Sequence, residues 1–297
     1  MKRTASRSRM HGLSMIEVMV SLIIGLVVVG AVLLSYVASG KTSRQQAAYA
    51  EMNENAQMAM TLMSRDLLLA GYSRVMAIPA VTPPAVSTFT RAYSGRAVFG
   101  CDKGFVTPNI KTSSGAVSCV TSSGTPSFEV TYEADTTNTV PVSGSPSDCK
   151  GSQIRPSLTS GTTTYFVTYN RYYLEVGGTG RSELHCASAT ENASGGAVPG
   201  EPLVDNVENM KIWYGEANSA NPRQIVRYVP ASAVADWTRI VSVRICLLMR
   251  SSEPVSDTEL AGTPTYLDCD SSVQNLPDRF LRRAYFTTTT LRNKMAF

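Results

Sequence analysis

The feature that most constrains this 297-residue chain is an apolar run near its N-terminus that a single acid interrupts. The run extends from Leu13 to Ala38 and contains Glu17 close to its start. The 21 residues of Val18–Ala38 carry no charge, and a helix of that length, at about 1.5 Å per residue, spans the hydrocarbon of a membrane. A carboxylate within such a helix costs roughly 2.5–3.5 kcal/mol on insertion scales. The presence of Glu17 therefore requires a physical reason.

A short basic segment, residues 1–12, precedes the apolar run and ends in Gly12. A secretory signal would place small residues after its apolar stretch, where the signal is cut away. Here the glycine lies before the apolar stretch, so cleavage after Gly12 would leave the apolar helix on the mature chain. The four basic side chains of this leader equal the formal net charge of +4, which leaves the rest of the chain near neutral. The basicity thus serves as an orientation signal and gives no indication of nucleic-acid binding.

A second apolar pattern follows the membrane-length run and has the period of an amphipathic helix. Gly71 is suited to the position after the last helical residue, so we expect one helix over Leu13–Ala70. We expect Met58–Leu69 to pack on the sheet of the chain's own domain, with Arg65 and Asp66 on the other face as a cap or domain contact. The apolar stripe consists of Ala48, Met52, Ala56, Ala59, Met63, Leu67 and Ala70.

After Tyr72 the sequence becomes rich in Ser, Thr, Gly and Pro, and short alternating segments with β-branched and aromatic residues predict strands. The fold class predicted is α+β, with one long N-terminal helix packed on an antiparallel β-sheet. The expected strands are 128–133, 165–176, 182–187, 207–214, 240–250 and 282–290.

The leader, Gly12, Ser14, Glu17 and the apolar helix together resemble the class III signal of type IV pilins and pseudopilins. The resemblance implies cleavage of the Gly12–Leu13 bond by a prepilin peptidase and N-methylation of Leu13. Glu17 would then be the fifth mature residue, which the family uses for assembly. Its carboxylate can pair with the α-amine of a neighbouring subunit, where a low dielectric strengthens the attraction. The simpler alternative is a signal-anchor helix with a chance acid.

Further segments resemble the PilW family of minor pilins. They are NENAQMAMTLMSRDLLLAGY at 53–72, DNVENMKIWYG at 205–215, RYVPAS at 227–232, WTRIVSVRICLLMR at 237–250 and RRAYFTTTTLRN at 282–293. The resemblance implies a pilin-like lollipop with four parts. These are a prepilin leader (1–12), a transmembrane and assembly helix (13–40), an amphipathic helix (41–71) and a periplasmic β-rich globular domain (72–297).

The family resemblance implies a structural protein, not an enzyme, that primes and assembles type IV pili near the filament tip. Its expected partners are other minor pilins, the major pilin, the prepilin peptidase, a PilY-type tip adhesin and inner-membrane lipid, with no nucleic acid. The expected location is the inner membrane, with the N-terminus cytoplasmic and the C-terminal domain periplasmic, and then the pilus at the cell surface. Whether such a pilus serves twitching motility, cell adhesion or DNA uptake stays open.

Two other functions fit the same sequence. The first is a minor pseudopilin of type II secretion, similar to the J-type subunit, which shares the leader and the overall plan. The second is a signal-anchored periplasmic binding module or enzyme whose function lies in the middle of the chain, about residues 76–200. The family-like blocks at both ends favour the pilus.

Six cysteines lie beyond the membrane-length run, and none belongs to a CxxC pair, which argues against a zinc ribbon or a thioredoxin motif. An even number in an exported domain favours disulfides. Short, turn-rich loops favour pairing Cys101 with Cys119 and Cys246 with Cys269; free buried thiols are the alternative. The candidates are Cys101, Cys119, Cys149, Cys186, Cys246 and Cys269.

The sequence carries little catalytic chemistry. Of two histidines, His11 belongs to the leader, and His185 lies in an expected strand beside Cys186, where a structural role is favoured over a nucleophilic site. HExxH, GxSxG, GxxxxGK[ST] and GxGxxG motifs are absent from the sequence. We therefore expect no cofactor and no metal, although a calcium site built from dispersed carboxylates stays open.

Overall fold

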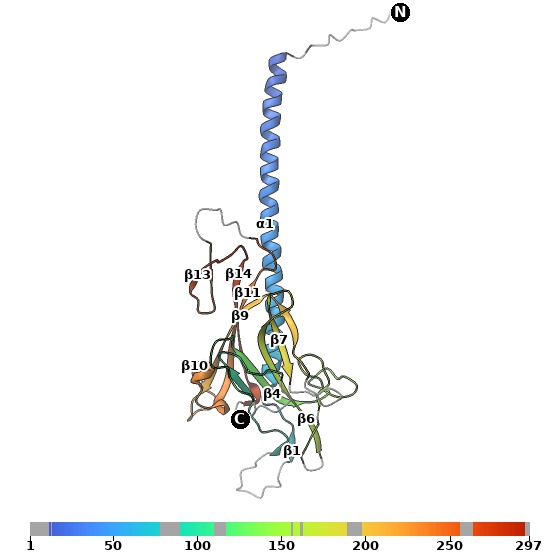
Figure 1. The fold of residues 1–297 in the computed structure, drawn as a ribbon, viewed down its shortest axis with the longest axis vertical. Helices are drawn as coiled ribbons and strands as arrows, with labels where there is room; N and C mark the ends of the chain where they lie inside the picture. The colour runs from blue at the N-terminus through green and yellow to red at the C-terminus, as the bar shows by residue number, and fades with distance from the viewer. Residues whose placement is uncertain are drawn as a thin grey trace, which may run out of the picture. The chain divides into compact units, whose positions relative to one another are not determined.

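A computed structural model describes residues 12, 14–77, 90–109, 117–155, 157–160, 163–188, 198–255 and 264–294. The chain divides into two compact units, with the boundary between Ala47 and Ala48. The long helix α1, Met15–Leu69, contributes to both units (Figure 1). Among its described residues, the globular unit also contains fourteen strands and short 3-10 turns, which include η2 (Ala231–Ala233), η3 (Trp237–Arg239) and η4 (Arg292–Lys294).

The second half of α1 buries the stripe expected from the sequence. All seven stripe residues are buried, and they form one core cluster with side chains of both large sheets. The helix stops at Leu69, and Gly71 adopts a positive φ of 73°, which glycine tolerates without a steric penalty. The Gly71 N–H donates to the carbonyl of Thr131 at 2.8 Å, so the end of the helix is tied directly to a strand.

The first large sheet has the strand order β3-β4-β6-β7-β8, and β5 pairs with β6. Every pairing is antiparallel. The strands are β3 (Val98–Cys101), β4 (Ser127–Ala134), β5 (Leu158–Ser160), β6 (Thr163–Val176), β7 (Ser182–Ser188) and β8 (Glu201–Asp205).

The second large sheet has the order β10-β9-β11-β14 and is also antiparallel. Two hairpin-like pairs, β1 with β2 and β12 with β13, complete the described strands. The bounds are β9 (Val207–Ala217), β10 (Ile225–Val229), β11 (Ile240–Arg250), β14 (Arg282–Thr290), β1 (Val75–Ala77), β2 (Thr90–Arg91), β12 (Thr265–Leu267) and β13 (Val273–Asn275).

The architecture confirms the α+β prediction, and it adds a division of the strands into two large sheets around one core. The helix hydrogen-bonds to both of them. Tyr285 of β14 donates to Asn53 of α1 at 2.5 Å, and Thr289 of β14 donates to Ser64 of α1 at 3.1 Å. Tyr132 of β4 contacts the same helix at another residue, Asp66.

The expectation that Asp66 lies on the face away from the buried stripe is wrong, whereas the expected contact with the domain is present. Asp66 is 7% exposed and accepts hydrogen bonds from Tyr172 (2.7 Å), Asn170 (2.6 Å) and Tyr132 (3.1 Å). These partners come from β4 and β6, so the carboxylate is a polar connection inside the helix–sheet interface. Burial raises the pKa of the Asp66 carboxyl, and the three hydrogen bonds offset part of that effect.

Three disulfides close the globular unit: Cys101–Cys119, Cys149–Cys186 and Cys246–Cys269, with Cα–Cα distances of 5.3, 6.4 and 5.7 Å. The first and third are the pairs favoured by loop length. The second joins the two cysteines that the sequence left unassigned. Each bridge is expected to contribute about 2–4 kcal/mol by restricting the unfolded chain.

The stripe predicts a sharp contrast between two apolar residues of α1. Leu67 is fully buried, so Leu67→Ala should lower the free energy of unfolding by about 2–5 kcal/mol. Met58 is 53% exposed, so Met58→Ala should change it by less than about 1 kcal/mol. Urea unfolding of the full chain in detergent, followed by near-UV circular dichroism, measures both. Equal losses for the two variants would contradict the packing described.

The raised pKa of Asp66 predicts a pH effect of defined sign. The pKa of Asp66 in the folded protein lies above its unfolded value of about 3.9. The contribution of the protonated Asp66 carboxyl to the free energy of unfolding is therefore complete below about pH 3.9 and is lost as the pH rises through the folded pKa. The free energy of unfolding of the wild type, relative to Asp66→Asn, should therefore fall as the pH rises from about 4 toward neutrality. Parallel pH profiles for the two proteins would show that Asp66 does not titrate in this way.

Candidate assembly site

The candidate site lies at the start of α1, where the helix begins immediately after Ser14. The Ser14 carbonyl accepts the N–H of Glu17 at 3.0 Å and of Val18 at 3.2 Å, which closes the first turn. Glu17 is the acid of this turn. A carboxylate at a helix N-terminus is favoured by the exposed N–H groups and the helix dipole.

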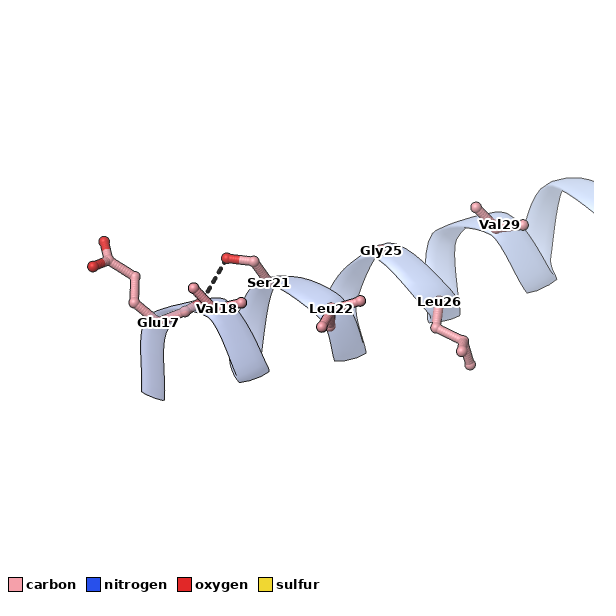
Figure 2. A pocket seen from close by; sticks show the side chains of 7 residues that line it. All are labelled: Glu17, Val18, Ser21, Leu22, Gly25, Leu26 and Val29. Carbon is pink, nitrogen blue, oxygen red and sulfur yellow. Dashed lines mark hydrogen bonds between the residues drawn. The ribbon is translucent and has the colours of Figure 1, made fainter. Parts of the chain in front are cut away.

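The Glu17 side chain extends away from the helix and is exposed (Figure 2). Within the described residues its carboxylate has neither a hydrogen bond nor an ion pair. The residues that follow on α1 are exposed and apolar, among them Leu22, Leu26 and Val29. The structure thus presents an unneutralised acid at the head of a long apolar surface. Such a group is costly in hydrocarbon and gains most from an opposite charge brought to it.

Ser21 and Gly25 follow Glu17 at intervals of four residues and line the same shallow hollow (Figure 2). The Ser21 hydroxyl donates to the Glu17 carbonyl at 2.6 Å, so this polar group is satisfied inside the helix. A Cβ added at Gly25 or Gly30 would meet no atom within 4 Å. Small residues at such spacing let a second helix approach closely. Ser21 was not singled out from the sequence, although its spacing from Glu17 was the available signal.

Helix α1 is long and apolar enough to cross a membrane, and it is the one such helix in the described part of the chain. The apolar part of this helix is entirely unburied within the described structure. This N-terminal helix is consistent with membrane anchoring.

The structure describes only one of the two residues at the expected cleavage position. Gly12 is described and exposed, whereas Leu13 lies outside the described residues, as does His11. A Cβ at Gly12 would meet no described atom within 4 Å. The Gly12–Leu13 cleavage, the methylation of Leu13 and the pairing of Glu17 stay predictions.

The other candidate residues lie in the globular unit. The His185 Nε2 atom of β7 lies 3.3 Å from Glu183 Oε2. The imidazole ring packs on the Tyr173 ring, with 5.7 Å between the ring centroids. Its neighbour Cys186 is in a disulfide. In the described ranges, no group of three or more His, Cys, Asp or Glu residues could hold a metal ion.

Two sequence profiles match this chain. Residues 171–293 match the family described as Type IV Pilus-assembly protein W. Residues 7–33 match the Prokaryotic N-terminal methylation motif. This range contains Gly12, Leu13, Glu17 and Ser21. The second match covers the candidate site, and the first covers the chain from the middle of β6 to η4.

Among solved structures, the chain is similar to a type IV-like pilin from Thermus thermophilus. The sequence identity is 13%, the TM-score is 0.39, and the alignment covers 82% of this chain and 97% of the other. No curated protein matches the chain.

The unpaired acid predicts how the isolated helix inserts into a membrane. Glu17→Leu should make insertion more favourable by about 1–3 kcal/mol, because it removes a carboxylate that has no partner among the described residues. Ser21→Ala should have little effect, since the hydroxyl is already bonded inside the helix. A translocon insertion assay on residues 1–47 measures both changes. Equal effects of the two variants would contradict the description of Glu17 as the unsatisfied group.

Proposed function

We propose that this chain, which belongs to the PilW family of type IV pilus-assembly proteins and carries an N-terminal methylation motif, is a minor pilin that helps to prime and assemble the pilus. The observation that carries the proposal is Glu17, an acid without an ion pair among the described residues, at the head of an exposed apolar helix. Family membership implies contact with the pilus machinery and with a prepilin peptidase. Its place near the filament tip, with other minor pilins and a PilY-type adhesin, belongs to the proposal.

Processing at Gly12 would supply the charge that Glu17 lacks. Cleavage of the Gly12–Leu13 bond creates a positive α-amine at the edge of the apolar helix. On a neighbouring subunit this amine can reach a Glu17 carboxylate, and in a low dielectric the pair is favourable only when both charges are present. The pair would then set the stagger between adjacent helices. Gly12 is exposed, which would leave it accessible to a processing enzyme.

The chemistry of the two units supports the proposed location. The basic leader favours a cytoplasmic N-terminus, which places the globular unit in the periplasm before assembly. Three disulfides suit that oxidising compartment. We assign residues 1–12 to the leader, 13–40 to the membrane and assembly helix, 41–71 to the amphipathic helix, and 72–297 to the globular domain.

The proposal predicts that Glu17 is needed for incorporation and not for processing. Glu17→Ala should leave cleavage at Gly12 and membrane insertion intact and should reduce the amount of the protein in purified pili by about tenfold or more, because the α-amine would lose its partner. Glu54→Ala is the matched control: it removes an exposed acid from the same helix. Quantitative immunoblots of sheared pili and of membranes measure incorporation and stability separately.

Normal incorporation of Glu17→Ala would overturn the role given to Glu17. Equal loss of both variants from pili would show that the assay reports a general effect of charge on α1. Loss of cleavage in Glu17→Ala would place the acid in processing, contrary to the proposal.

A further inference from the structure

The second large sheet has one face in the core and one face turned away from it. Side chains alternate between the two faces of a strand, so Tyr214 and Ile212 point into the core while Trp213 and Lys211 point outward. In register, Trp213 lies opposite Arg244 of β11, and Arg244 lies opposite Thr288 of β14. We call this side of β10, β9, β11 and β14 the outer face.

One half of the outer face is covered by the β12–β13 hairpin. The Cys246–Cys269 disulfide fastens the hairpin to β11, and Leu248 of β11 packs in the same small cluster. Asp270 of the hairpin segment forms an ion pair with Lys211 of β9. The Lys211 ammonium also lies 5.4 Å from the centroid of the Trp213 ring. The segment that covers this half is thus a hairpin whose turn places the Asp270 carboxylate against Lys211.

The other half of the outer face is uncovered in the described structure and carries an oriented arginine. The Arg244 guanidinium lies 4.4 Å from the centroid of the Tyr228 ring, and Arg244 is exposed. The Tyr228 ring rests against Gly215, where an added Cβ would lie 3.1 Å from the ring, and its hydroxyl contacts Ser242 at 3.2 Å. Stacking on an aromatic ring holds a guanidinium plane in one orientation.

Within the described residues, Arg244 has no carboxylate partner, in contrast to Lys211 on the covered half. Phe286, 51% exposed, lies one residue pair further along the same face, opposite Cys246. Arginine and exposed aromatic side chains are enriched at the centres of protein interfaces. The uncovered half therefore offers a cation that is pre-oriented and an apolar contact beside it.

We propose that the uncovered half of the outer face, centred on Arg244 and Tyr228 with Thr288 and Phe286, binds an acidic segment of a partner protein. A carboxylate of that segment bonds the Arg244 guanidinium, as Asp270 pairs with Lys211 on the covered half. Charge complementarity favours an acidic protein over nucleic acid. The Lys211 charge is already matched by Asp270, and the uncovered half is centred on the single guanidinium of Arg244, whereas binding of a phosphate backbone needs several cations.

The test uses the full chain in detergent and a labelled probe peptide, Thr-Val-Thr-Asp-Thr-Val-Thr, titrated by fluorescence anisotropy. The same peptide with Asn in place of Asp is the control ligand. The wild type should bind the acidic peptide about tenfold more tightly than the Asn peptide, a preference that Arg244→Ala should abolish. Arg155→Ala, which removes an exposed arginine elsewhere in the globular unit, should retain it.

A second variant keeps the arginine and supplies a competing carboxylate. Thr288 is the cross-strand neighbour of Arg244 on the same face, so the glutamate of Thr288→Glu should pair with Arg244. This variant should weaken binding of the acidic peptide about as much as Arg244→Ala does. Unchanged thermal unfolding would show that the variants fold. No binding by the wild type, equal affinity for the two peptides, or an unchanged preference in Arg244→Ala would overturn the proposal. Tighter, Arg244-dependent binding of an oligothymidylate would overturn it in favour of nucleic acid.

Discussion

The structure depends on one constraint: helix α1 has to satisfy two environments with a single continuous backbone. Between Met15 and Ala47 the side chains are almost entirely exposed, and those of the first turns are apolar on most sides of the helix. An apolar surface of this kind requires lipid or other helices to cover it. From Ala48 onward one stripe is apolar, and the core of the globular unit covers it. The hydrophobic effect therefore determines which part of the helix packs in the core of the globular unit, and it leaves the other part exposed.

A polar connection fixes the position of the packed half within its apolar interface. Asp66 lies beside the fully buried Leu67 and receives hydrogen bonds from two tyrosines and one asparagine of β4 and β6. Sliding α1 by one turn would leave this carboxylate buried without donors, at a cost of several kcal/mol. Apolar contacts alone would tolerate such a shift more easily, so Asp66 makes the helix position specific.

Local signals in the sequence predicted much of this fold. The period of the stripe gave the helix, and β11 and β14 were predicted with the bounds they have in the structure, 240–250 and 282–290. Asp66 was placed wrongly because it lies at the boundary of the stripe and its partner Tyr172 is 106 residues away in sequence. The division into two sheets and the Cys149–Cys186 bridge likewise depend on non-local pairing, which short-range patterns do not specify.

The central claim is that cleavage supplies the positive charge that Glu17 needs. Mass spectrometry of the N-terminal peptide of the protein in purified pili tests it most directly. The account predicts a mature chain that begins at Leu13 and carries one methyl group on its α-amine. An N-terminus at Met1, or one that lies beyond Ala38, would contradict it, because neither places an amine beside the carboxylate at the head of α1.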